Sequence, residues 1–190
     1  MKYMVAIIIC FFDFIQAEGS NPEPFSRLSM SIQFEQNINH NDFHNYWKTQ
    51  NGFNISYYTP FYFGNLLAGF NYLSYNSKKK TNPDYQSYFI YSGLEYNINL
   101  IDNFAFVPGI RFGNYLMNFN IESEGSNKYE SEICIEYIIK LVYRMNKDLQ
   151  INWEIGKKYI YTYKDLNFLL FKAGVTFRLS KPDWLEDFFE

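Results

Sequence analysis

Apolar and polar residues alternate along most of this chain with a period of two, which is typical of β-strands that have one apolar and one polar face. Turn residues divide the pattern into segments, and no stretch between the N-terminal region and the C-terminal tail shows a convincing helical period. An even number of strands suits an antiparallel up-and-down barrel, which closes without an unpaired edge. We count eight strand segments, at about 25–36, 45–59, 63–77, 85–99, 103–120, 129–145, 149–162 and 167–180.

The connections between these predicted strands alternate between short and long. In transmembrane barrels of the outer membrane, short turns face the periplasm and longer loops face outside. The same arrangement here would place both ends of the barrel segment on the periplasmic side. The short turns are 59–63, 99–103 and 145–148, and the longer, more polar loops are 37–44, 77–84, 122–128 and 163–167.

The two faces of the predicted strands differ strongly in polarity. One face carries large apolar side chains, such as those of Ile32, Phe70, Ile135 and Phe171. They far outnumber the roughly dozen side chains that fill a small barrel, even one wide enough to hold a small ligand. The apolar face must therefore point outward, and an outward apolar belt of that extent is tolerated only in lipid. We therefore expect an all-β protein with an eight-stranded antiparallel up-and-down transmembrane β-barrel at 25–180.

The polar face would then line the lumen, where acidic and basic side chains nearly balance. Buried charges persist when they are paired and hydrogen-bonded, so we expect an internal ion-pair network that plugs the barrel. Eight strands leave no aqueous channel, which favours a solid polar core over a narrow proton or ion path. The predicted network comprises Arg27, Glu35, Glu95, Arg111, Glu132, Glu136, Lys140, Glu154, Lys158, Lys172 and Arg178.

Two features of the strands lead to local expectations. Pro108 falls within the fifth strand, where its missing N–H breaks a ladder bond, so a bulge is expected there. Tyrosine and tryptophan residues near strand ends are expected to form aromatic girdles at the membrane interfaces. These residues are Tyr46, Trp47, Tyr75, Tyr88, Tyr143 and Trp153.

Composition strengthens the membrane interpretation, because 22% of the residues are aromatic. A water-soluble domain of this size has too little core to bury so many rings. The net charge of −3 gives no sign of the basic surface of a nucleic-acid-binding protein. Cys134 is the only cysteine beyond the N-terminal region, which leaves no internal disulfide. No cluster of Cys, His and carboxylate residues has the spacing of metal ligands, and no Gly-rich phosphate loop is found. We therefore expect no metal and no cofactor.

Both ends of the chain fall outside the barrel pattern. Residues 1–17 combine Lys2 with a short apolar run and a small residue at a plausible cleavage point, which predicts a secretory signal peptide. The alternative is a retained membrane anchor, although the run is too short to span a bilayer as a helix. Residues 18–24 would be a linker. Residues 181–190 would form a periplasmic tail, as either a short amphipathic helix or a loosely ordered segment.

The last predicted strand carries a sequence pattern of its own. Lys172 is followed by Gly174 and then by Phe177 and Leu179, which resembles the assembly signal of outer-membrane barrel proteins. With the leader and the strand count, residues 25–180 resemble the small porin-like outer-membrane β-barrel superfamily, which includes OmpA-like and OmpX-like eight-stranded barrels. In that family the signal usually closes the chain, whereas here residues 181–190 follow.

The resemblance implies a location and a set of partners. The location is the outer membrane of a Gram-negative bacterium, reached after secretion through the inner membrane. The implied partners are outer-membrane lipid, lipopolysaccharide and the barrel-assembly machinery, with no nucleic acid. The protein is expected to be a monomer.

Three functional hypotheses remain open. The main one is a non-enzymatic structural or surface-binding barrel that contacts ligands through its loops, by analogy of fold. The second is a lipid A-modifying acyltransferase or deacylase, which needs a histidine with a serine and a carboxylate near the outer rim. The third is a narrow conduit for small hydrophobic compounds. Candidate residues for the enzyme are His40, Asp42, His44, Asp84 and Ser87, although no spacing fixes a triad.

The lysine triplet Lys78–Lys80 lies in the second long loop. It could bind acidic lipopolysaccharide or another anionic partner. A solvated loop triplet is the simpler interpretation.

Overall fold

The computed structural model describes residues 23–38, 42–79, 82–120, 128–163 and 166–179. The predicted leader and the C-terminal tail lie outside these residues. The described residues form ten strands in one sheet and one short 3-10 helix, η1. The elements are β1 (Leu28–Asn37), η1 (Asp42–Asn45), β2 (Trp47–Thr49), β3 (Gly52–Phe61), β4 (Gly64–Ser77), β5 (Tyr85–Glu95), β6 (Ile98–Ile101), β7 (Phe104–Phe119), β8 (Tyr129–Arg144), β9 (Leu149–Ile160) and β10 (Leu166–Leu179).

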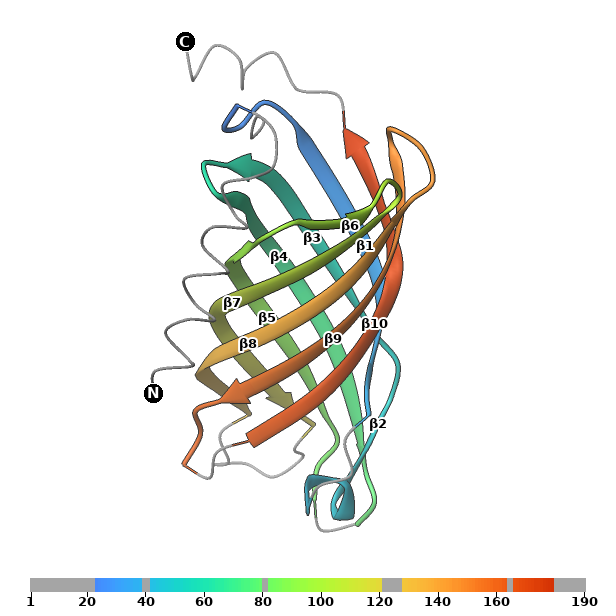
Figure 1. Cartoon of the computed structure of the whole chain (residues 1–190). Helices are drawn as coiled ribbons and strands as arrows, with labels where there is room; N and C mark the ends of the chain where they lie inside the picture. Colours follow the sequence, from blue (N-terminus) through green and yellow to red (C-terminus); the bar gives the residue numbers. More distant parts are fainter. Residues whose placement is uncertain (1–22, 39–41, 80–81, 121–127, 164–165, 180–190) are drawn as a thin grey trace, which may run out of the picture.

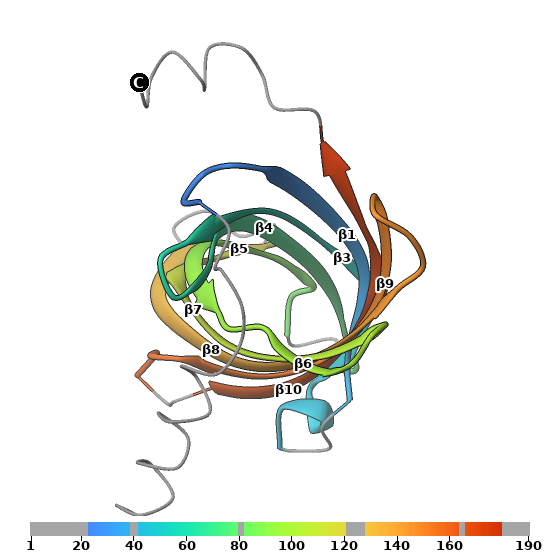
Figure 2. The same cartoon turned by 45° about the horizontal axis from the view of Figure 1, so that its top comes forward.

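The eight longer strands of the described chain close into an antiparallel barrel, which confirms the predicted fold (Figures 1 and 2). Their order around the barrel is β1, β3, β4, β5, β7, β8, β9 and β10. Strand β10 then pairs with β1 from Leu28↔Leu179 to Asn37↔Leu170, so within the described residues no long strand keeps a free edge. The short strands β2 and β6 pair with β4 and β7 beyond the ends of β3 and β5.

The break between β5 and β6 lies opposite Pro108. Tyr96 N donates to Pro108 O at 2.9 Å, but proline has no N–H with which to return the bond. The bulge predicted at Pro108 was wrong, because Pro108 stays in register with Ile139 and the register shift falls between Asn99 and Ile101. The missing hydrogen bond interrupts the neighbouring strand and adds no residue to β7.

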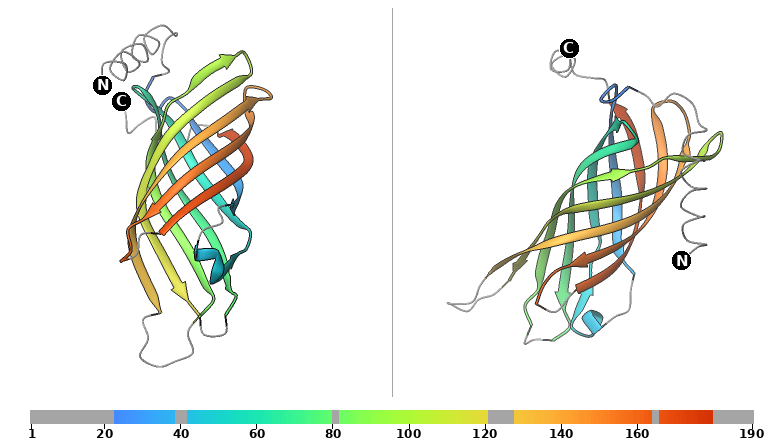
Figure 3. Two further views of the ribbon diagram at one scale, coloured as in Figure 1. Left: turned by 60° about the horizontal axis from the view of Figure 1, so that its bottom comes forward. Right: turned by 60° about the vertical axis from the view of Figure 1, so that its left-hand side comes forward.

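The two rims of the barrel differ in their connections (Figures 1 and 3). At the turn rim, short turns join β3 to β4, β6 to β7 and β8 to β9, and β1 begins and β10 ends there. At the loop rim, longer segments join β1 to β2, β4 to β5, β7 to β8 and β9 to β10. This is the alternation of short and long connections that the sequence predicts.

The outward face of the barrel is apolar and exposed. Ile32, Phe112, Ile139 and Ile155, on four different strands, have 43%, 55%, 54% and 52% of their surface exposed. A monomer in water rarely exposes apolar surface of this extent, whereas lipid accommodates it. Among the described residues, no helix is long and apolar enough to cross a bilayer.

A charged side chain on this face should destabilise the barrel strongly near its middle and only weakly at its rim. Ile135 lies between the outward residues Phe112 and Tyr159 of the adjacent strands. We expect Ile135→Arg to lower the free energy of unfolding by about 2–4 kcal/mol, because the bilayer midplane desolvates the guanidinium. Ile101→Arg, at the turn rim, should cost about 0–1 kcal/mol. Urea unfolding of both variants in lipid vesicles checks this, and equal costs would contradict a lipid-facing belt.

Candidate functional site

Charged side chains meet in the middle of the lumen, where they are almost fully buried. They come from the inward-facing positions of β1, β5, β7, β8, β9 and β10. Four carboxylates and four cations cancel one another. This lumen network comprises, among the described residues, Glu35, Glu95, Arg111, Glu136, Lys140, Glu154, Lys158 and Lys172.

Arg111 is the central cation of the lumen network. Its Nη1 and Nη2 donate to the two carboxylate oxygens of Glu154 at 2.7 Å each, which is a bidentate pair. The same nitrogens reach Glu136 and Glu95 at 3.2 Å. Its guanidinium carbon also lies 5.1 Å from the centre of the Tyr91 ring. Arginine suits this position because its planar fork can serve several carboxylates at once.

The lysines extend the network to both sides of Arg111. Lys172 Nζ lies 2.7 Å from Glu136 Oε1 and 3.0 Å from Glu154 Oε1. Lys140 Nζ donates to Glu95 Oε2 at 2.5 Å. Since the ion pairs are continuous and buried, removing one charge would leave its neighbours uncompensated.

Amide side chains cross the lumen beside the charges. Gln33 Nε2 donates to Asn152 Oδ1 at 2.7 Å, and Gln33 Oε1 accepts from Asn54 Nδ2 at 2.8 Å. Asn54 Oδ1 accepts from the Tyr91 hydroxyl at 2.7 Å. The middle of the lumen is therefore a hydrogen-bonded core.

Three residues predicted for the network lie elsewhere on the same inward face. Arg27 and Arg178 line a pocket at the turn rim. Glu132 is half-buried nearer the loop rim, and among the described residues no ion pair joins it to the network. Each strand residue advances about 3.3 Å along the strand, so charges near strand ends cannot reach those in the middle.

The loop half of the lumen is apolar, which the sequence analysis did not anticipate. Phe43 of η1 folds over the strand ends, and its ring centre lies 4.9 Å from that of Phe168 and 5.3 Å from that of Tyr75. Tyr75 and Tyr85 stack at 4.5 Å. These rings close the lumen at the loop rim. The buried rings, called the aromatic plug below, are Phe43, Tyr75, Tyr85, Phe89, Tyr115 and Phe168.

Tyr75 and Trp47 were wrongly assigned to the aromatic girdles. Tyr75 is 0% exposed inside the plug. Trp47 stacks on Phe43 at 5.1 Å, and its Nε1 donates to Pro83 O at 2.9 Å. The sequence held a signal for this, because Leu73 and Tyr75 are large and apolar at inward positions near the end of β4. Side chains fill the interior of an eight-stranded barrel, so large inward residues form its core.

Inward-facing glycines leave room for the large lumen side chains. A Cβ on Gly156 would lie 2.6 Å from Glu136 Oε1, and one on Gly69 would lie 2.5 Å from the Tyr91 hydroxyl. A larger residue at either position would displace the lumen side chain that it meets.

The residues of the predicted assembly signal alternate between the two faces of β10. Lys172 belongs to the lumen network, and Gly174 lies opposite Gln33 where β10 meets β1. A Cβ on Gly174 would overlap the carbonyl oxygen of Ile32, so this junction requires glycine. Phe177 and Leu179 lie on the opposite face toward the turn rim. Recognition of this strand by an assembly machinery stays a prediction.

The candidate enzymatic residues occupy different environments. His40 lies outside the described residues, and Asp42 begins η1. Asp84 Oδ1 accepts a hydrogen bond from Ser77 N, and the buried Ser87 Oγ donates to Leu73 O at 3.3 Å. The ring of His44 packs edge-on against Phe43. The side chains of Asp84 and Ser87 thus stabilise backbone at the loop rim.

Cys134 is a buried free thiol in the apolar core of the loop half. It packs there among buried aromatic and aliphatic side chains. Within the described ranges, no group of three or more His, Cys, Asp or Glu residues could hold a metal ion.

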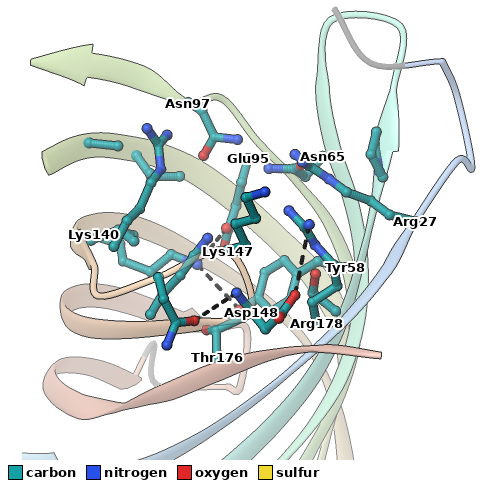
Figure 4. Close-up of a pocket in the computed structure, with 18 residues that line it drawn as sticks. Arg27, Tyr58, Asn65, Glu95, Asn97, Lys140, Lys147, Asp148, Thr176 and Arg178 are labelled. Atoms are coloured by element: carbon teal, nitrogen blue, oxygen red, sulfur yellow. Dashed lines mark hydrogen bonds and ion pairs between the residues drawn. The ribbon is translucent and has the colours of Figure 1, made fainter. Parts of the chain in front are cut away.

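A pocket of about 220 Å³ opens at the turn rim (Figure 4). Glu95 and Lys140 of the lumen network form its inner end. Arg27, Arg178 and Asp148 lie closer to the rim. The described lumen therefore consists of a polar pocket, the ion-pair network and the aromatic plug, in that order from turn rim to loop rim.

The closed barrel, the alternation of turns and loops and the outward apolar belt define the class of protein: the chain has the fold of the small eight-stranded outer-membrane β-barrels. No protein-family model matches the chain. No curated protein matches it in sequence either.

Solved structures share this fold at low sequence identity. Neisserial surface protein A (NspA) is 13% identical with a TM-score of 0.57, over 81% of this chain and 97% of that one. Ail of Yersinia pestis, in complex with the heparin analogue sucrose octasulfate, is 15% identical with a TM-score of 0.53, over 83% and 100%. The outer membrane protein OprG of Pseudomonas aeruginosa is 10% identical with a TM-score of 0.50, over 86% and 100%.

Proposed function

We propose that this protein is a monomeric outer-membrane barrel of a Gram-negative bacterium, with a structural or surface-binding role exerted at its loop rim. The lumen supports this over a conduit, because ion pairs and packed rings fill its middle and its loop half. A filled lumen leaves the two rims as the surfaces available to soluble ligands. We place the loop rim outside the cell, since long loops face outward in such barrels.

The first two loops are held in a fixed arrangement by hydrogen bonds and ring contacts. This arrangement is the observation that supports the surface-binding role. Residues 42–50 and 76–84, apart from 80–81, form what we call the loop platform. Lys78 N donates to Tyr46 O at 2.8 Å, and Lys78 Nζ donates to His44 O. Phe43 anchors the platform in the aromatic plug. A preorganised surface loses little conformational entropy on binding.

Exposed tyrosine and lysine side chains give the loop rim its chemistry. Tyrosine offers a rigid contact area with a polar tip, and lysine offers positive charge. Lys79 Nζ lies 4.5 Å from the centre of the Tyr46 ring, whereas the Lys78 ammonium is already bonded within the platform. This surface suits an anionic ligand such as lipopolysaccharide or a sulfated polysaccharide. Its exposed side chains include Tyr46, Lys48, Lys79, Lys128, Tyr129 and Tyr163, together with the carboxylates of Asp84 and Glu130.

Cysteine labelling in intact cells tests the location and the orientation. Tyr163→Cys at the loop rim and Lys147→Cys at the turn rim are introduced separately in a Cys134→Ser chain. A membrane-impermeant maleimide should label Tyr163→Cys in intact cells and Lys147→Cys only after the outer membrane is permeabilised. Labelling of Lys147→Cys alone in intact cells would reverse the proposed orientation. Depletion of the barrel-assembly machinery should abolish both signals.

Binding of heparin tests the surface-binding role. The Ail structure contains a heparin analogue, which makes heparin a reasonable first probe here. Cells that express the protein should bind fluorescent heparin more strongly than vector cells. The combined change Tyr46→Ser, Lys48→Gln and Lys79→Gln should remove most of the increase, with neutral dextran as the control. Equal binding by expressing and vector cells would refute sulfated polysaccharides as the ligand class and leave the structural role.

The enzymatic alternative makes a different prediction. A lipid A acyltransferase or deacylase would change the mass spectrum of lipid A in expressing cells. Our proposal predicts unchanged spectra relative to vector cells. A new lipid A species that disappears when both His40 and His44 are replaced by alanine would establish the enzyme instead.

A further inference from the structure

The pocket at the turn rim has an excess of positive charge. Glu95, at its inner end, already accepts hydrogen bonds from Lys140 and Arg111. The remaining cations therefore face a single carboxylate of the lining, that of Asp148. The charged lining consists of the cations Arg27, Lys140, Arg144, Lys147 and Arg178 and the carboxylates Glu95 and Asp148, which gives a net formal charge of +3.

Asp148 compensates this excess only weakly. Its Oδ1 lies 3.9 Å from Arg178 Nη1, and its side chain is 74% exposed. In the part of the chain that the structure describes, no carboxylate forms an ion pair with Arg27, Arg144 or Lys147. The lumen network is neutral, so the excess charge belongs to the rim.

The crowding of cations is evident at Arg27, which precedes β1 at the rim. Burial lowers the pKa of its guanidinium, and the neighbouring charges of Arg178 and Arg144 lower it further. Cations held close together without counter-charge repel one another, and a bound anion would relieve that repulsion.

The shape and the hydrogen-bond donors of the pocket set the kind of anion. Its volume of about 220 Å³ suits a small molecule. Arg27 and Arg178 lie beside each other in the pocket (Figure 4). Guanidinium groups bind phosphate and carboxylate in bidentate geometry. Neutral donors such as Asn65 and Asn97 line the same pocket.

We infer that the turn-rim pocket is a binding site for a small polyanion, a molecule or segment that carries two or more phosphate or carboxylate groups. The pocket opens at the end of the barrel and away from its apolar belt, which favours a water-soluble ligand over a lipid headgroup. The site is independent of the loop-rim function proposed above.

The chain itself contains the same ligand chemistry. Residues 181–190 follow β10 and include Asp183, Glu186, Asp187 and Glu190. Carboxylates joined by a short tether to Arg178 would be present at a high effective concentration. The experiment must therefore separate a free anion from the chain's own acidic residues.

Isothermal titration calorimetry of the full chain in detergent micelles, with pyrophosphate as the probe, tests the site. We expect one molecule to bind, and Arg27→Gln or Arg178→Gln to weaken binding by about tenfold, because each removes charge-assisted hydrogen bonds. Asp148→Asn should strengthen binding, since it removes a competing carboxylate. Lys157→Gln makes the same charge change on the outward face of β9, away from this pocket and from the loop-rim surface. It is the matched control and should leave binding unchanged.

A second chain with Asp183→Asn, Glu186→Gln, Asp187→Asn and Glu190→Gln separates the two sources. Pyrophosphate binding in this chain but not in the unaltered chain would show that the acidic residues of 181–190 occupy the site. Absence of binding in both chains would overturn the inference. Undiminished binding by the Arg27→Gln and Arg178→Gln variants, provided that both keep the gel mobility of a folded barrel, would also overturn it.

Discussion

Arg111→Met should lower the free energy of unfolding by about 3–5 kcal/mol. The substitution keeps an elongated side chain but removes the cation that Glu154 and Glu136 share in a fully buried site. Lys172 would then be the one ion-pair partner left to both carboxylates among the described residues. Urea unfolding in lipid vesicles, followed by tryptophan fluorescence, measures the loss.

Two companion variants make the result specific to the ion pairs. Glu132→Gln changes a charge on the same inward face outside the network and should cost less than about 1 kcal/mol. Adding Glu154→Gln to Arg111→Met should recover part of the stability, because it removes one uncompensated carboxylate. An Arg111→Met variant as stable as the unaltered chain would show that the lumen network does not hold the barrel together.

Phe168→Ala should cost about 3–5 kcal/mol, the second large effect. The Phe168 side chain is 0% exposed, and its ring centre lies 4.9 Å from that of Phe43 and 5.9 Å from that of Tyr75. Its loss would leave a cavity in the middle of the aromatic plug and remove one of the ring contacts that anchor η1. The same unfolding assay measures the stability, and limited proteolysis of the first loop measures the release of η1.

Exposed and conservative changes provide the comparison for Phe168. Tyr163→Ala removes a ring that is 101% exposed at the loop rim and should change stability by less than about 0.5 kcal/mol. Phe168→Leu should recover much of the loss, since it refills most of the cavity. A tolerated Phe168→Ala with an unchanged first loop would show that the plug is not a packed core.

The strands could be predicted from the sequence because a period of two is a local property. The alternation from Ile32 to Glu35, for example, places side chains on opposite faces wherever the strand lies in the barrel. The sequence analysis missed the break that Pro108 causes, because the break lies on the neighbouring strand, at Tyr96. The sequence of one strand does not show which residue of the neighbouring strand loses a hydrogen-bond partner.

The lumen was less predictable, because its contacts depend on the stagger between strands. The alternation along each strand places Arg111 and Glu154 on the inward face. Only the stagger of the strands in the closed barrel brings them to the same level along the barrel axis. The same stagger leaves Arg27 and Arg178 at the rim, away from the network. The plug was missed for another reason: the inward face was taken to be polar throughout, although Tyr75 and Phe168 already occupied inward positions near the loop rim.

The most direct test of the central claim, that the apolar belt faces lipid, is cell fractionation combined with gel mobility before and after boiling. The account predicts a protein found with the outer membrane, released only by detergent, and migrating differently once heat unfolds the barrel. A stable monomer recovered in detergent-free buffer, with the same mobility before and after boiling, would contradict it.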